Sequence, residues 1–150
     1  KINYFDYDKT IEIKKSKKII NNKYCLFHDE YLPFHPDFEI KNHNIVDSEQ
    51  YFNDLNRFFT EIENKLNIQV VIAAHPKAKK YKLKNHFNNR KVFFSKIAEL
   101  SKYSEFSIAH ASTSISYPVI YNKPVLFINS NKIKNTMFFL INGLSVLLMN

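Results

Sequence analysis

Apolar runs alternate with amphipathic segments along the chain, which predicts strands that alternate with helices. The run 69–74 is continuous and rich in β-branched residues, as is typical of a strand buried on both faces. In the segment before it, apolar residues recur at helical spacing over 51–66. Gln50 follows Asp47 at the spacing of a capping box. We therefore expect a helix that begins near Asp47 or Ser48, ends near residue 66 and contributes its aromatic side chains to the core.

Shorter segments continue the pattern on both sides of this pair. Further strands are expected over 24–27, 92–94, 106–110 and 124–128, and further helices over 96–103, 112–121 and 137–149. Loops are expected over 31–44 and over 77–91, the second as an exposed Lys- and Asn-rich connection that can include a helical turn. Residues 1–22 read as a linker or an edge strand, because apolar and polar residues alternate from Thr10 to Ile13.

Strands that alternate with helices of this length are typical of βαβ units and a parallel sheet. The pattern predicts the α/β class, with a Rossmann-like three-layer α/β/α domain over residues 23–150. In such sheets, ligands bind beyond the carboxyl ends of the strands. Polar residues cluster at three of these ends, namely His28-Asp29-Glu30, His75-Pro76-Lys77 and His110 with Ser112-Thr113-Ser114.

The run Ser112-Thr113-Ser114 lies where a predicted strand turns into a helix. Backbone N–H groups and hydroxyls at such a turn can bind an anion, and an ordinary Ser/Thr helix cap is the alternative. His75, held by the rigid Pro76, can donate a hydrogen bond to a phosphate oxygen or protonate a leaving phosphate, and Lys77 adds positive charge. The alternative is a histidine that satisfies a local carbonyl, next to solvated lysines.

Two adjacent carboxylates, Asp29 and Glu30, follow the first predicted strand, with His35 and Asp37 further along. They can act as a base or bind a ribose hydroxyl, and polar loop residues are the alternative. Their spacing matches no established zinc motif, so no metal is expected. The single cysteine, Cys25, lies in an apolar run and is expected to be a small buried hydrophobe.

The composition limits which classes of partner and which kinds of phosphate site are expected. The net charge of +8 and the pI near 9.4 favour an anionic partner, although a Lys- and Asn-rich background composition would give the same charge. One glycine in 150 residues excludes the Gly-rich phosphate loops. One cysteine favours a reducing, cytoplasmic setting, and no apolar run is long enough to span a bilayer. The chain begins with Lys rather than Met, which leads us to expect part of a longer protein.

Several of these segments occur in a known order. The segments are Val71-Ile72-Ala73-Ala74-His75-Pro76-Lys77, Ala98-Glu99-Leu100, Phe106-Ser107-Ile108-Ala109-His110-Ala111-Ser112-Thr113-Ser114 and Asn122-Lys123-Pro124-Val125-Leu126-Phe127-Ile128. Together they resemble the C-terminal, nucleotide-sugar-binding domain of GT-B glycosyltransferases. The likeness covers residues 23–130 and is closest to the bacterial sialyltransferase and capsular polysaccharide transferase group, which carries His-Pro and Ser/Ser-Thr motifs.

The resemblance implies one half of a GT-B architecture. It implies that His75, with Pro76 and Lys77, and Ser112 and Thr113, with Ser114 nearby, bind the phosphate of a CMP- or UDP-type sugar donor. Asp29 and Glu30, together with His110, are expected at the donor cleft. The acidic motif of the family is followed by Gly, whereas Glu30 is followed by Tyr31, so the two are not equated.

The expected partners are the donor and a glycan or lipid acceptor held by a second, N-terminal domain. No cofactor, metal or nucleic acid is expected, and the isolated chain is expected to be inactive. The expected location is the cytoplasm, with peripheral contact to the inner face of the membrane left open. Two alternatives remain: a related enzyme on the same fold, such as a nucleotide-sugar 2-epimerase or a glycerophosphate transferase, and a non-enzymatic basic module that binds nucleotide, nucleic acid or anionic lipid.

Overall fold

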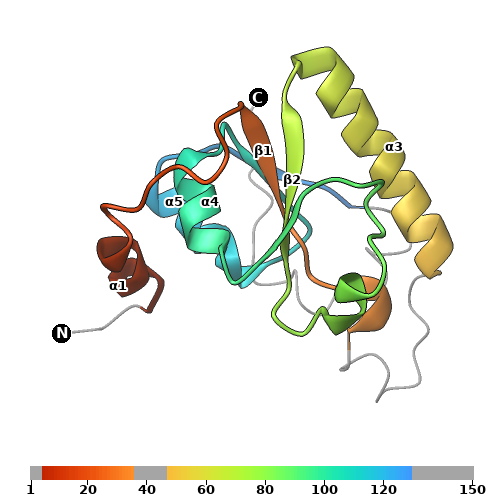
Figure 1. Ribbon diagram of the computed structural model, residues 1–150, viewed down its shortest axis with the longest axis horizontal. Coiled ribbons are helices and arrows are strands. Elements are labelled where there is room, and N and C mark those ends of the chain that lie inside the picture. Colours follow the sequence, from red (N-terminus) through yellow and green to blue (C-terminus); the bar gives the residue numbers. More distant parts are fainter. Residues whose placement is uncertain (1–4, 36–46, 130–150) are drawn as a thin grey trace.

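The computed structural model describes residues 5–35 and 47–129, and a five-stranded parallel sheet forms its centre (Figure 1). The strands are β1 (Tyr24–His28), β2 (Gln69–Ala74), β3 (Val92–Phe94), β4 (Ser107–Ala109) and β5 (Val125–Phe127). Their order across the sheet is β3-β2-β1-β4-β5, and all four pairings are parallel. The strand order therefore reverses between β1 and β4, as in Rossmann-like domains.

Helices cover both faces of the sheet, which confirms the predicted three-layer α/β/α arrangement. The long helix α3 (Ser48–Leu66) lies on one side of the strands, and α4 (Ile97–Tyr103), α5 (Ser116–Ile120) and α1 (Phe5–Glu12) lie on the other (Figure 1). Successive side chains of β1 serve the two layers in turn. Cys25 and Phe27 pack on the α3 side, whereas Tyr24 and Leu26 pack on the α4 side.

Helix α3 follows the prediction at both ends. The side chain of Asp47 accepts a hydrogen bond of 2.7 Å from the backbone N–H of Gln50, which caps the first turn. The helix ends at Leu66, and Asn67 takes a left-handed conformation with φ of 51°. The buried residues of the helix are Tyr51, Phe52, Leu55, Asn56, Phe59 and Ile62. The aromatic side chains predicted to be core are thus core, apart from the half-buried Phe58.

The two short helices and the remaining strands also lie where the sequence places them. The segment after β4 begins as a 3₁₀ turn, η3 (Thr113–Ile115), and continues into α5. In the described part of the expected loop over 31–44, Leu32–Phe34 form a 3₁₀ turn, η1, whereas residues 36–44, including Asp37, lie outside the described residues. The predicted helix over 137–149 also lies outside them.

The prediction of an edge strand near the amino end was wrong. Residues 5–12 form α1, with Asp6 and Asp8 in its first turn, where carboxylates favour a helix. The Thr10 hydroxyl is turned back onto the carbonyl of Tyr7, and the Ser116 hydroxyl of α5 donates to the carboxylate of Asp6. Contact with α5 therefore fixes a helix where a short alternation suggested a strand.

The connection after β2 is only partly exposed, which corrects the second expectation. It contains a 3₁₀ turn, η2 (Lys79–Lys82), and three of its apolar side chains are buried: Ala78, Tyr81 and Phe87. Tyr81 and Phe87 pack edge to face with ring centroids 5.1 Å apart. The lysines between them are exposed. Their number made the segment read as polar in sequence, although Tyr81 and Phe87 are buried under it in the fold.

Cys25 is fully buried, and burial raises the pKa of its thiol to about 12. Because the thiolate is the reactive form, we expect a thiol reagent such as DTNB to leave the folded protein unmodified at neutral pH and to modify it completely in denaturant. The absorbance of the released thiolate measures both states. Rapid modification of the native protein would show that Cys25 is accessible.

Candidate functional site

The carboxyl ends of β1, β2 and β4 meet at one edge of the sheet, and the three predicted clusters all lie there. His28 pairs with Ala73 of β2 and Ala109 of β4, so the residues that follow these positions emerge side by side. Strands β2 and β4 flank β1, which sets them about 10 Å apart. Ligands of open parallel sheets bind at such an edge where the strand order reverses, here between β1 and β4.

The serine cluster forms a compact turn. Ser112 is the N-cap of η3, and its hydroxyl accepts the backbone N–H of Ser114 at 3.3 Å. The two serine hydroxyls lie 2.7 Å apart. Ser112 and Ser114 are half-buried, whereas Thr113 is exposed. Capping is therefore one role of Ser112, and the exposed hydroxyl of Thr113 is available at the surface of the turn.

His28 ties this turn to the sheet. Its imidazole is fully buried, with Nδ1 2.8 Å from the hydroxyl of Ser114 and Nε2 3.0 Å from the hydroxyl of Ser107 in β4. Burial lowers the pKa of His28 to about 4, so the ring is neutral at physiological pH. A neutral imidazole with both nitrogens bound positions the serine turn rather than carrying charge.

His75 is half-exposed, directly after β2, and Pro76 and Lys77 beside it are exposed. Its Nδ1 accepts the backbone N–H of Lys77 at 3.2 Å. The proton of the neutral ring therefore sits on Nε2, which makes that atom a hydrogen-bond donor. The ring of His35 packs against it edge to face, with centroids 5.2 Å apart. A ring in this tautomer can donate a hydrogen bond to a phosphate oxygen.

Asp29 is buried beneath His75. One carboxylate oxygen accepts the hydroxyl of Tyr81 at 3.1 Å, and the other accepts the backbone N–H of His75 at 3.3 Å. Burial raises the pKa of Asp29 to about 6, and these hydrogen bonds act in the opposite direction. Both oxygens thus bind groups of the chain itself, and Asp29 fixes the start of the His75 segment.

Glu30 bridges the two central strand ends. Its half-buried carboxylate accepts the backbone N–H of Ala111 at 2.6 Å, across the point where the strand order reverses. Burial raises the pKa of Glu30 to about 7; the amides of Ala111 and His110 lower it, and the neighbouring Asp29 raises it further. A carboxylate with unused lone pairs at this place can accept hydrogen bonds from a hydroxylated ligand.

His110 lies at the same edge but faces the core. Its Nδ1 donates to the carbonyl of Ile128 at 2.8 Å, so its Nε2 accepts the hydroxyl of Tyr51 at 3.1 Å. Burial lowers the pKa of His110. With both nitrogens bound to the chain, His110 joins α3 to the segment after β5 and orders the base of the site.

Sequence reasoning missed three residues that shape this edge: Ser107, Tyr51 and Tyr81. Ser107 is a polar residue inside a run that is otherwise apolar, and a fully buried hydroxyl needs a partner, which His28 supplies. The two tyrosines looked like core side chains, and their rings are core. Their hydroxyls bind His110 and Asp29, and no sequence pattern signals those pairings.

Among residues 5–35 and 47–129, no group of three or more His, Cys, Asp or Glu side chains gathers as metal ligands. Over the same ranges, every helix is too short or too polar to cross a membrane.

Comparison with family models, curated proteins and solved structures found no significant match. The chemistry of the site therefore rests on its own geometry. The edge carries an imidazole, a lysine, an exposed threonine and a half-buried carboxylate, which are residue types that suit an anionic ligand with hydroxyl groups.

Proposed function

We propose that this chain binds a nucleotide-activated sugar of the CMP or UDP type at the carboxyl edge of its sheet, as the donor-binding domain of a glycosyltransferase. One observation carries the proposal. The three clusters that the sequence singles out, at residues 28–30, 75–77 and 110–114, lie at the same carboxyl edge of a Rossmann-like sheet, and the first and third flank the point where the strand order reverses. The motif order that resembles GT-B donor domains is the second support.

In this proposal, the phosphate of the donor is bound by side chains and not by a glycine-rich loop. His75 presents Nε2–H, Lys77 presents an ammonium group, and Thr113 presents an exposed hydroxyl. All three donate hydrogen bonds and none requires a metal. When the bond between sugar and nucleotide breaks, negative charge grows on the departing phosphate, and donors fixed in advance at that position stabilise it. In this proposal His75 is the residue that touches the departing phosphate.

The carboxylate of Glu30 fits the hydroxyl-bearing part of the donor. One of its oxygens is used by Ala111, and a carboxylate has further acceptor positions for a ribose or sugar hydroxyl. Asp29 acts indirectly, because both its oxygens hold the chain. The acceptor and the base that activates it belong to a second domain in this proposal, so donor binding is the property that this chain can be tested for.

A thermal-shift series with CMP, CDP, UDP, GDP and the corresponding nucleotide sugars tests the proposal. A nucleotide at a hundredfold excess over its dissociation constant stabilises the protein by about 2.7 kcal/mol, which corresponds to a rise in Tm of roughly 5–10 °C for a domain of this size. We expect nucleotides with one particular base to raise Tm more than the others. The nucleotide sugar with that base is expected to bind at least as tightly as the free nucleotide.

The variant His75→Ala is expected to weaken that nucleotide about 10- to 100-fold, because one hydrogen bond to a charged group is lost. Thr113→Val removes a hydroxyl at nearly constant shape and should weaken it less. Lys23→Ala changes an exposed residue just before β1, at the opposite edge of the sheet, and serves as the control. Failure of every nucleotide to raise Tm, or equal protection of His75→Ala and the parent protein, would refute the proposal.

A further inference from the structure

Residues 77–84, here called the basic turn, form the most strongly charged segment of this edge. The turn contains five lysines, Lys77, Lys79, Lys80, Lys82 and Lys84. No Asp or Glu occurs anywhere from His75 to Ala98, so the local sequence of the turn is purely basic. One apolar side chain, that of Leu83, stands among the lysines and is 90% exposed.

The basic turn is held rigidly from below. Tyr81 is buried, its hydroxyl donates to Asp29, and its ring packs edge to face on Tyr31 with centroids 5.1 Å apart. The backbone N–H of Leu83 donates to the carbonyl of Lys80 at 3.0 Å and closes the turn. The lysines and the leucine are therefore presented on a fixed base, and little conformational entropy of the backbone is lost when a partner binds.

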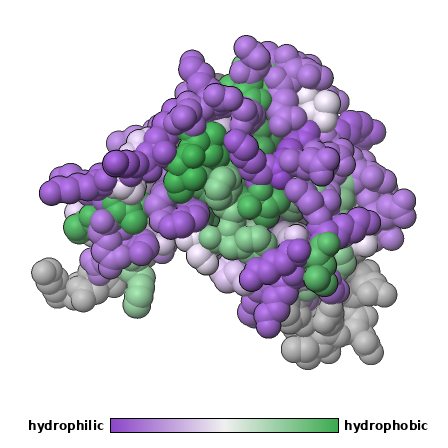
Figure 2. Space-filling model, in the orientation of Figure 1, coloured by the Kyte–Doolittle hydropathy of each residue, from purple (hydrophilic) through white to green (hydrophobic). Residues whose placement is uncertain are grey.

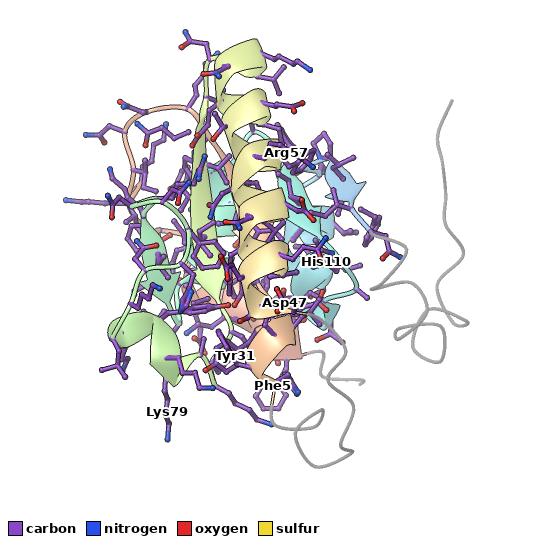
Figure 3. All side chains as sticks on the ribbon, turned by 90° about the vertical axis from the view of Figure 1, so that its right-hand side faces the viewer. Phe5, Tyr31, Asp47, Arg57, Lys79 and His110 are labelled. Atoms are coloured by element: carbon purple, nitrogen blue, oxygen red, sulfur yellow. The ribbon has the colours of Figure 1, made fainter. Side chains whose placement is uncertain are left out.

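Two of the ammonium groups lie over aromatic rings that belong to neighbouring segments. Lys80 Nζ lies 4.3 Å from the centre of the Phe34 ring, and Lys82 Nζ lies 5.5 Å from that of Phe94. Lys79 points away from the body of the domain, at the lower end in Figure 3. In Figure 2, hydrophilic side chains lie beside a small hydrophobic area in the region where η1 and η2 lie.

We infer that the basic turn docks on the surface of an anionic lipid bilayer. Lysines near such a surface are attracted by its negative potential, and an exposed aliphatic side chain gains free energy by entering the boundary between headgroups and acyl chains. Leu83 is what separates this partner from a nucleic acid. A phosphate backbone offers an aliphatic side chain nothing, and single-stranded nucleic acids bind through exposed aromatic rings, whereas Tyr81 and Phe87 are buried.

The inference does not depend on the proposed function, but it is compatible with it, because both concern the same edge of the sheet. The basic turn follows His75 by two residues and lies at the carboxyl edge of the sheet, like the candidate site. Docking through Lys79, Leu83 and Lys84 would place that edge towards the bilayer. A lipid-linked acceptor would then meet the site from the membrane side.

Sedimentation of the full chain with vesicles tests this inference. One set of vesicles contains phosphatidylcholine alone, and the other contains two parts phosphatidylcholine to one part phosphatidylglycerol. We expect binding to the anionic vesicles only, weakened by salt because screening shortens the reach of the surface potential. The double variant K79Q/K84Q should bind about twentyfold more weakly, and Leu83→Ser about tenfold more weakly.

Each variant has a matched control at the opposite edge of the sheet. K23Q/K91Q removes the same charge from exposed positions directly before β1 and β3, and Leu66→Ser removes a leucine that is 54% exposed at the end of α3. Both controls should bind like the parent chain. Equal binding of Leu83→Ser and the parent, binding to neutral vesicles of the same strength, or a preference for an RNA oligonucleotide that Leu83→Ser leaves intact would overturn the inference.

Discussion

Replacing Arg90 with alanine should lower the free energy of unfolding by about 3 kcal/mol, because it removes one partner of a desolvated ion pair. The guanidinium of Arg90 makes a two-pronged contact with Glu63, with Nε 3.1 Å from one carboxylate oxygen and Nη2 2.7 Å from the other. The side chain of Arg90 is only 8% exposed, and that of Glu63 is 29% exposed. The residual exposure of Glu63 places the expected loss at the lower end of the range for buried pairs.

The remaining contacts of Arg90 lead us to expect that other residues replace it poorly. Nη1 donates to the side-chain oxygen of Asn56 at 3.0 Å and to the carbonyl of Phe87 at 3.2 Å, and Nη2 donates to the hydroxyl of Thr60 at 3.0 Å. Arg90 therefore links α3 to the segment that leads into β3. Lysine keeps the charge but lacks this planar set of donors, so Arg90→Lys should also destabilise the fold.

Urea unfolding followed by circular dichroism measures both losses. Arg57→Ala is the matched control, because the pair of Arg57 and Asp54 on the same helix is exposed, with side chains 76% and 58% accessible. Exposed pairs contribute about 0–1 kcal/mol, so the control should change stability little. An Arg90→Ala protein no less stable than the Arg57→Ala protein would contradict the structural role given to Arg90.

The second large effect concerns Glu30 and pH. Burial raises the pKa of Glu30 from 4.5 to about 7 in the folded protein, so the folded state holds this proton more tightly than the unfolded state does. The resulting stability is fully present below pH 4.5 and is lost as pH rises through about 7. Gln cannot ionise, yet its carbonyl oxygen can still accept the N–H of Ala111. Glu30→Gln should therefore gain about 2 kcal/mol over the parent protein above the folded pKa, after a discount for partial exposure.

The difference between variant and parent must be measured, because other groups titrate in the same range. Burial lowers the pKa of His28 from 6.5 to about 4, so the stability that depends on neutral His28 is present above 6.5 and is lost as pH falls through about 4. This trend opposes that of Glu30 in the unsubtracted curve. Chemical unfolding across the pH range, with the exposed Glu105→Gln as control, gives the contribution of Glu30 together with its coupling to Asp29. A variant-minus-parent difference that does not change with pH would show that Glu30 is well solvated in the folded state.

The strands and the main helix followed from sequence because local and long-range forces agree there. The run 69–74 is apolar on both faces and lies in the middle of the sheet, and Asp47 supplies a cap directly before an amphipathic stretch. Helix α1 could not be found in this way. Its position depends on contacts with α5, such as that between Asp6 and Ser116, which are far apart in the sequence.

For the site, sequence indicated which strand ends carry polar residues, and the parallel topology brought those ends together. It could not assign the separate tasks of the carboxylates, because these depend on which backbone amides and hydroxyls each one meets. Both carboxylate oxygens of Asp29 accept hydrogen bonds, from Tyr81 and His75, whereas the carboxylate of Glu30 accepts one from the backbone of Ala111. The bonding of His28 to serines on both sides also arises only when β1 and β4 pair.

The single carboxylate of Asp29 is bound by two consecutive segments of the chain. Tyr81 and His75 bind its two oxygens, so the turn that holds the lysines and the strand end that holds the imidazole share one fixed point. Neither segment can shift by much more than a bond length without breaking one of these hydrogen bonds. Force applied to the tip of the turn is thus carried through Tyr81 to the backbone beneath His75.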